Sequence, residues 1–164
     1  MQKISVIGAG SWGTTLAVLL GEKGFDVKLW VRREELANQI KSEKENKQYH
    51  PGIKIPSNVI ADHSLKNAIE NSEIIITAVP SEFLRSTIRE IRHHYSSQII
   101  VSTTKGIEHN SCKRMSQVIE DEIGKAKIAV LSGPNHAEEV SIKLPTASVV
   151  ASKDKKTGKI VADC

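Results

Sequence analysis

A glycine-rich segment near the start of the chain constrains its fold more than any other feature. Gly8, Gly10 and Gly13 lie between an apolar run at residues 4–7 and a second apolar run that ends at Leu20. In a strand–loop–helix unit, the first glycine permits a tight turn, the second lets a pyrophosphate approach the backbone, and the third lets the helix pack closely on the strand. The start of the helix directs unpaired N–H groups at the anion. The segment predicts a dinucleotide site; the alternative is a glycine turn in another α/β protein.

Apolar runs alternate with helical patterns along the rest of the chain. The expected strands cover residues 3–7, 26–31, 58–61, 73–79, 98–103, 127–131 and 146–151. The expected helices cover residues 12–23, 34–42, 64–70, 80–91, 112–123 and 135–142, and another helix begins after residue 154. In the fourth helix the apolar face is expected to comprise Phe83, Leu84, Ile88 and Ile91. The polar stretch 43–56, which contains two prolines and a glycine, is expected to be a surface loop.

Four of the expected strands, at 3–7, 73–79, 98–103 and 127–131, show little alternation between apolar and polar residues. Such strands are buried on both faces, which is typical of a parallel sheet with helices on each side. At 164 residues the chain can form one compact domain that buries roughly 70% of the surface of its unfolded form. The sequence therefore predicts an α/β fold of the Rossmann type, with a doubly wound, mostly parallel sheet, in a single domain over residues 1–164.

Composition argues against several other classes of function. Aromatic residues make up 4% of the chain, too few for a base-stacking surface on single-stranded nucleic acid. The net charge of +4 comes from lysines and arginines interspersed with acids, which argues against nucleic-acid binding and suits attraction of small anions. Cys112 and Cys164 do not make a disulfide framework, and neither a signal-peptide pattern nor a run of about 20 apolar residues is present. We expect a cytoplasmic protein with no membrane span.

The residues after the second expected strand bear on the choice of dinucleotide. Arg32 and Arg33 follow this strand directly, and Glu34 comes next. A guanidinium offers planar donors suited to phosphate, and in this fold an arginine here accommodates the 2′-phosphate of NADP(H). A carboxylate at the same place binds the ribose hydroxyl of NAD(H). We predict that NADP(H) is preferred, with NAD(H) left open through Glu34; the alternative is that both arginines are simply solvated.

Ligands of open parallel sheets bind beyond the carboxyl ends of the strands, so the residues that follow each strand are informative. Pro80 follows small residues suited to lie along a cofactor. Lys105 is suited to bind a substrate phosphate or to polarise a carbonyl, and the alternative is a loop lysine in water. The turn at Gly133 and Asn135 offers backbone N–H groups and the Asn135 side-chain amide to an anion or a hydroxyl. The alternative is that Asn135 is simply the N-cap of the helix expected over residues 135–142. The histidines lack the spacing of metal ligands and no nucleophile elbow is present, so no metal site and no hydrolase chemistry are expected.

Five segments together closely resemble the bacterial-type NAD(P)-dependent glycerol-3-phosphate dehydrogenases. They are residues 8–14, 30–32, 78–81, 102–108 and 131–140, which occur in the family's order across essentially the whole chain. The Ser-Trp pair in the glycine loop, the Thr-Lys-Gly-Ile-Glu run and the Ser-Gly-Pro-Asn-His-Ala-Glu-Glu run are far more specific than the glycines alone. The resemblance implies reduction of dihydroxyacetone phosphate to sn-glycerol 3-phosphate, a precursor of glycerophospholipids.

The resemblance implies roles for particular residues, which join those predicted from the motifs. The residues expected to bind the dinucleotide are Gly8, Gly10, Ser11, Trp12, Gly13, Arg32, Arg33, Pro80, Lys105 and Ala137. Those expected to bind the phosphorylated substrate are Lys105, Gly133 and Asn135. Lys105 would also stabilise the negative charge that develops on the substrate oxygen. Asn135 departs from the Ser or Thr often found in the family, and Thr15, where alanine is common, is expected to be a neutral change.

The resemblance also implies a part that lies outside residues 1–164. The family continues into a helical domain that holds residues for the substrate phosphate and a lysine that acts as general acid and base. Loss of a general acid typically costs about 10²–10⁴ in rate, so this chain alone is expected to be weakly active or inactive. Its exposed interdomain face would favour a homo-oligomer. The alternatives are the cofactor domain of a related hydroxyacyl or sugar-acid dehydrogenase, and a non-catalytic dinucleotide-binding or interaction domain.

Overall fold

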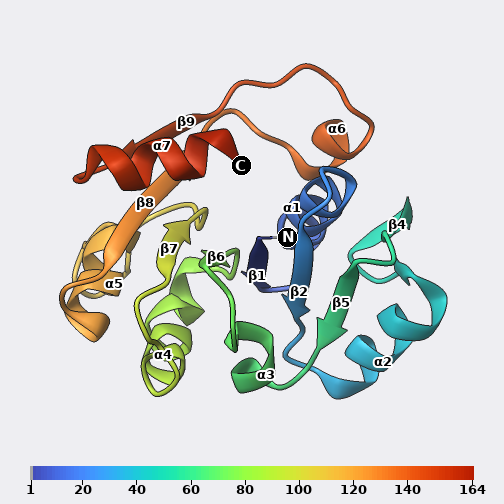
Figure 1. Cartoon of the computed structure of the whole chain (residues 1–164), viewed down its shortest axis with the longest axis horizontal. Coiled ribbons are helices and arrows are strands. Elements are labelled where there is room, and N and C mark those ends of the chain that lie inside the picture. The colour runs from blue at the N-terminus through green and yellow to red at the C-terminus, as the bar shows by residue number, and fades with distance from the viewer. Residues whose placement is uncertain (1) are drawn as a thin grey trace.

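The computed structural model describes residues 2–164 as an open seven-stranded sheet with helices on both faces (Figure 1). The strands of this sheet are β1 (Lys3–Ile7), β2 (Asp26–Trp30), β5 (Val59–Asp62), β6 (Ile74–Thr77), β7 (Ile99–Ser102), β8 (Lys127–Ser132) and β9 (Val149–Ser152). Their order across the sheet is β5-β2-β1-β6-β7-β8-β9. Neighbouring strands are parallel except β8 and β9, which are antiparallel. The order runs outward from β1 on one side and outward from β6 on the other, which confirms the doubly wound Rossmann-type fold.

The helices follow the predicted pattern closely. They are α1 (Ser11–Glu22), α2 (Glu34–Glu43), α3 (Leu65–Ile69), α4 (Ser81–Arg92), α5 (Met115–Ile123), α6 (Ala137–Ser141) and α7 (Lys155–Asp163). Side chains of β1 point alternately to the two faces of the sheet, so Val6 packs in one apolar cluster with residues of α1, and Ile7 packs in another with residues of α3, α4 and α5. Within residues 2–164, no helix is both long and apolar enough to cross a bilayer.

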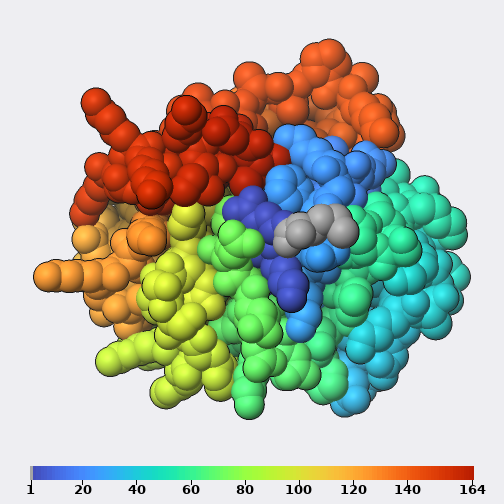
Figure 2. All heavy atoms as spheres, viewed as in Figure 1, coloured from blue at the N-terminus to red at the C-terminus, as the bar shows by residue number. Residues whose placement is uncertain are grey.

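Helix α7 covers the same face of the sheet as α1. Its N-cap, Asp154, accepts hydrogen bonds from the backbone N–H groups of Lys156 and Thr157, which confirms the helix expected after residue 154. Figure 2 shows α7 beside the α1 segment, and Lys23 Nζ there donates to the Cys164 carbonyl at 2.6 Å. This contact joins the end of α1 to the end of α7.

The carboxyl ends of four strands lie level with one another. Ile7 of β1 pairs with Trp30 of β2 and with Thr77 of β6, and Thr77 pairs with Ser102 of β7. The connections diverge between β1 and β6, because the segment after β1 leads to β2 and the segment after β6 leads to β7 on the opposite side. A ligand crevice is expected at this point in a doubly wound sheet.

The prediction of a surface loop over residues 43–56 was wrong, because this stretch contains a β-hairpin. Strands β3 (Glu45–Asn46) and β4 (His50–Lys54) pair with each other antiparallel. Asn46 is fully buried, and its Nδ2 donates to Thr14 Oγ1 of α1 at 2.9 Å. A buried polar side chain that finds its partners inside the protein gives no apolar pattern, so hydropathy does not reveal it.

Two further interpretations need correction, and one residue has contacts that the sequence did not indicate. Thr15, expected to be a neutral change, has its Oγ1 3.1 Å from Nε2 of His50, a residue only 4% exposed. Phe83 does not lie in the core: it is 40% exposed, whereas the other three residues of the predicted apolar face are fully buried. Asn135 does not cap α6, whose N-cap is His136 with no side-chain hydrogen bond. The amide of Asn135 is used elsewhere.

Candidate functional site

A cleft of about 720 Å³ opens at the carboxyl ends of β1, β2, β6 and β7, which is where the topology predicts a ligand. Its lining residues come from the glycine loop, the end of β2, the start of α4, the exit of β7 and the start of α6. The predicted cofactor residues that line it are Gly8, Gly10, Ser11, Trp12, Arg32, Arg33, Pro80, Lys105 and Ala137. The remaining predicted residue, Gly13, lies beneath the loop. The fold therefore brings together residues that are up to 129 positions apart, from Gly8 to Ala137.

The three glycines of the loop have three different surroundings. Gly8 has φ +115°, and a Cβ there would lie 2.8 Å from the Ala78 carbonyl oxygen. A Cβ on Gly13 would lie 1.9 Å from the Gly8 carbonyl oxygen, so only glycine lets α1 begin this close to the loop. A Cβ on Gly10 would meet no heavy atom within 4 Å, so this position faces open space at the start of α1. The loop therefore exposes backbone to the cleft at Gly10 and is held in shape by Gly8 and Gly13.

The two arginines after β2 lie exposed on the wall of the cleft. The guanidinium carbon of Arg32 lies 5.3 Å from the centroid of the Phe83 ring, a cation–π distance. Arg33 donates a hydrogen bond to the side-chain oxygen of Gln48 in the hairpin. Among the described residues, neither guanidinium forms a salt bridge, and Glu34 does not line the cleft. Both positive charges are therefore free to meet an anion.

Lys105 lies at the opposite side of the cleft, just after β7. Its Nζ donates to the backbone carbonyl of Asn135 at 2.9 Å, which joins the exits of β7 and β8. The hydroxyl of the preceding Thr104 donates to the Val79 carbonyl at 2.9 Å and ties this segment to the end of β6. The amine is thus held at the edge of the cleft by neighbouring backbone and keeps further N–H donors for a ligand.

The structure separates the two other residues predicted to bind substrate. Asn135 lines the cleft, but the residue is only 4% exposed and its side chain is bound to the following segment: Nδ2 donates to Thr146 Oγ1 at 2.6 Å and to the Ala147 carbonyl at 3.1 Å. Gly133 does not line the cleft, and a Cβ there would lie 2.3 Å from the Ala147 carbonyl oxygen. The amide of Asn135 and the missing side chain of Gly133 thus both serve the packing of residues 146–147 in this structure.

Sequence reasoning missed the aromatic character of the cleft. Four of the six aromatic residues in the chain line it, namely Trp12, Trp30, Tyr49 and Phe83. Tyr49 lies in the hairpin, where its carbonyl accepts a hydrogen bond from Ser11 Oγ at 2.6 Å. Flat rings on the wall of a cleft suit a nucleoside base or a nicotinamide ring. One feature of the sequence could have indicated these rings. Phe83 comes only a few residues after the end of an expected strand, in a chain that has few aromatic side chains.

One buried histidine supports the site from below. His50 of the hairpin contacts Thr15 of α1, and burial lowers its pKa while the nearby carboxylate of Glu138 raises it. Burial is the larger effect, so the neutral imidazole is favoured.

Within residues 2–164, no three His, Cys, Asp or Glu side chains gather as a set of metal ligands. The cleft therefore offers backbone amides, cations and aromatic rings.

Comparison with known proteins shows the family to which the sequence is similar. The sequence model described as "NAD-dependent glycerol-3-phosphate dehydrogenase N-terminus" matches residues 3–158. The chain is 45% identical over 163 residues to a glycerol-3-phosphate dehydrogenase [NAD(P)+] of Moorella thermoacetica and 46% identical over 166 residues to one of Chlorobium phaeobacteroides, with 99% of this chain covered in each case. It covers 48% and 50% of those relatives, so the chain spans about half the length of the curated relatives it matches.

A solved structure shows the same arrangement. The crystal structure of glycerol-3-phosphate dehydrogenase from Coxiella burnetii superimposes with a TM-score of 0.94 at 32% sequence identity. The match covers 99% of this chain and 50% of that one. The similarity in fold therefore extends over nearly the whole of this chain.

Proposed function

Because the chain belongs to the family of NAD-dependent glycerol-3-phosphate dehydrogenase N-terminal regions, we propose that it forms the dinucleotide-binding part of an enzyme that reduces dihydroxyacetone phosphate to sn-glycerol 3-phosphate with NAD(P)H. The observation that carries this proposal is the cleft at the carboxyl edge of the sheet, whose lining contains the open Gly10 together with two exposed arginines and a lysine. The cleft combines donors for phosphate with flat apolar walls, which is the chemistry that a dinucleotide requires.

The residues present fit a dinucleotide. The backbone N–H groups at the start of α1 would bind the diphosphate, since no side chain at Gly10 keeps it away. Arg32 and Arg33 would bind a 2′-phosphate on the adenosine ribose, which supports a preference for NADP(H) over NAD(H). Phe83 holds the Arg32 guanidinium from one side and would leave its N–H edge for the phosphate. When bound, the dinucleotide supplies the hydride.

The chain's own contribution to the chemical step centres on Lys105. As a hydride adds to the carbonyl carbon of the substrate, negative charge develops on the carbonyl oxygen, and a nearby ammonium stabilises that charge. Asn135 would contribute mainly through its backbone carbonyl, which holds Lys105 Nζ at 2.9 Å. The proton that completes the alcohol is assigned to a group outside residues 1–164. This division of labour explains the expectation that the chain alone is weakly active or inactive.

A fluorescence titration of the purified chain with NADPH and NADH tests the proposal. We expect saturable binding of both nucleotides, tighter for NADPH. In an absorbance assay with dihydroxyacetone phosphate, the chain alone is expected to oxidise NADPH slowly or not at all. Absence of binding of either nucleotide would refute the proposed function, and equal affinity for the two would refute the role given to the arginines.

A further inference from the structure

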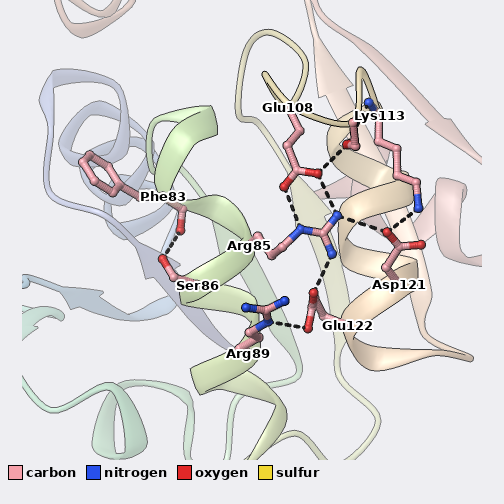
Figure 3. Close-up of polar contacts among 9 residues, drawn as sticks. Phe83, Arg85, Ser86, Arg89, Glu108, Lys113, Asp121 and Glu122 are labelled. Atoms are coloured by element: carbon pink, nitrogen blue, oxygen red, sulfur yellow. Dashed lines mark hydrogen bonds and ion pairs between the residues drawn. The ribbon is translucent and has the colours of Figure 1, made fainter.

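A cluster of ionised side chains joins α4, α5 and the loop that follows β7 (Figure 3). It contains three cations and three carboxylates, namely Arg85, Arg89, Lys113, Glu108, Asp121 and Glu122. Arg85 lies at its centre. Nε and Nη2 of Arg85 donate to the two oxygens of Glu108 at 2.7 Å each, and Nη1 donates to Glu122 at 2.5 Å. This use of the guanidinium requires its planar fork of donors, which a lysine does not have.

Glu108 anchors the loop that carries Lys105. The N–H of Glu108 donates to the Lys113 carbonyl and its carbonyl accepts from the Cys112 N–H, each at 2.9 Å, so the backbone of Glu108 belongs to a closed turn. On the other side of Lys105, Thr104 is tied to the end of β6. Between the two anchors lies Gly106, whose φ of +96° lets the chain turn sharply. The chain on either side of Lys105 is therefore held, by Thr104 before it and, after it, by the Ile107–Arg114 bridge and by Glu108, whose carboxylate binds Arg85.

The other side of α4 forms part of the cleft. Phe83, Ser86 and Thr87 line the cleft, and Phe83 lies against Arg32. Figure 3 shows Phe83 and Arg85 pointing to different sides of the helix. One helix thus carries both a wall of the dinucleotide cleft and the anchor of the Lys105 loop. Loss of the anchor would let the lysine move relative to that wall.

We propose that Arg85 and Glu108 are positioning residues, whose bidentate ion pair holds the backbone at Lys105 so that its amine meets the bound dinucleotide. The inference rests on the proposed function, which puts Lys105 against the dinucleotide. Neither Arg85 nor Glu108 lines the cleft, so their effect on the ligand is transmitted through the loop.

Because Glu108 is ionised, its charge in the ion pair with Arg85 can be removed by a single substitution. The Arg85 guanidinium is the main cause that lowers the pKa of Glu108, to about 2, and the Ser111 hydroxyl adds to this effect. The carboxylate is therefore ionised at every pH used for binding measurements. Substitution of Glu108→Gln removes that charge and one acceptor oxygen with almost no change in volume.

A double-mutant cycle between Glu108→Gln and Lys105→Ala tests the inference, with NADPH fluorescence titration of the chain as the measurement. Each single variant is expected to weaken NADPH binding roughly tenfold, the loss typical of one charge-assisted hydrogen bond. The double variant is expected to bind no more weakly than Lys105→Ala alone, because the anchor acts only through the lysine. Additive losses would show a general structural effect and would overturn the inference.

Matched variants separate the possible outcomes. Arg89→Gln removes another contact between α4 and α5, the 3.0 Å pair with Glu122, and is expected to leave NADPH affinity unchanged. If circular dichroism shows that Glu108→Gln is unfolded, Arg85→Lys replaces it in the cycle, since it keeps the charge and loses the fork. Wild-type chain that does not bind NADPH would refute the proposed function as well. Binding that is weakened by Lys105→Ala but not by Glu108→Gln or Arg85→Lys would overturn this inference alone, and so would a Lys105→Ala variant with wild-type affinity.

Discussion

Substitution of single glycines by alanine should separate ligand binding from folding in the loop after β1. Gly10 has φ −72° and ψ −178°, which alanine adopts without strain, and its added Cβ would meet nothing within 4 Å. Gly10 is also the N-cap of α1, where alanine is less favourable than glycine. Lost freedom of the unfolded chain offsets this cost, so the free energy of unfolding of Gly10→Ala is expected to stay within about 1 kcal/mol of that of the wild type. The methyl group would occupy the space through which a diphosphate approaches the backbone. NADPH binding is expected to weaken by about 10–100-fold, the equivalent of one charge-assisted hydrogen bond.

Gly13→Ala should show the opposite behaviour. Its Cβ would lie 1.9 Å from the Gly8 carbonyl oxygen, so the backbone of the loop or of the helix has to shift. Overpacking of this kind costs about 2–3 kcal/mol. The higher helix propensity of alanine returns about 1 kcal/mol. We therefore expect a net loss of about 1–2 kcal/mol in the free energy of unfolding.

Urea unfolding and NADPH titration of the two variants, side by side with the wild type, provide the measurements. Gly10→Ala is expected to keep a free energy of unfolding within about 1 kcal/mol of that of the wild type and to bind NADPH poorly. A Gly10→Ala variant that folds and binds NADPH with wild-type affinity would show that the diphosphate does not approach the backbone at Gly10. A Gly13→Ala variant with unchanged stability would show that α1 can move away from the loop at no cost.

Three other predictions address the arginines, the buried histidine and self-association. Arg32→Ser and Arg33→Ser are each expected to weaken NADPH binding about tenfold and to change NADH binding little, as fluorescence titration would show. Burial lowers the pKa of His50 from 6.5, so as the pH falls the unfolded chain takes up a proton before the folded chain does. The free energy of unfolding should therefore fall as the pH drops below about 6.5. Urea titrations between pH 7.5 and 5.5 would measure this dependence, and His50→Gln should flatten it. The expected self-association should appear in sedimentation velocity as a sedimentation coefficient that rises with protein concentration, and a constant monomeric value would contradict it.

The sheet could be predicted from the sequence because its strands are buried on both faces. Ile74, Ile75 and Ile76 in β6 form an apolar run that indicates a buried strand, and Pro80 marks where the strand has ended. The hairpin could not be predicted in the same way. Asn46 and His50 are buried through hydrogen bonds to α1, and such partners are distant in the sequence.

A site residue could be predicted where its type and its place after a strand are enough to suggest its role. It could not be predicted where its role depends on contact with a distant segment of the chain. Lys105 and the arginines follow strand exits, so the topology alone places them near a ligand. Arg85 meets carboxylates that are 23 and 36–37 positions away, and nothing in the local sequence marks it as different from Arg89. The packing of Asn135 on residues 146–147 likewise depends on the path of the chain between β8 and β9.

We propose that the glycine loop, the arginines after β2 and Lys105 surround one bound NADPH molecule. Amide ¹⁵N–¹H spectra recorded while NADPH is added to the isotope-labelled chain would test this arrangement residue by residue. The amides of residues 8–13, Arg32, Arg33 and Lys105 are expected to shift together along one binding curve. Shifts confined to another face of the sheet, or an unchanged spectrum at saturating NADPH, would contradict it.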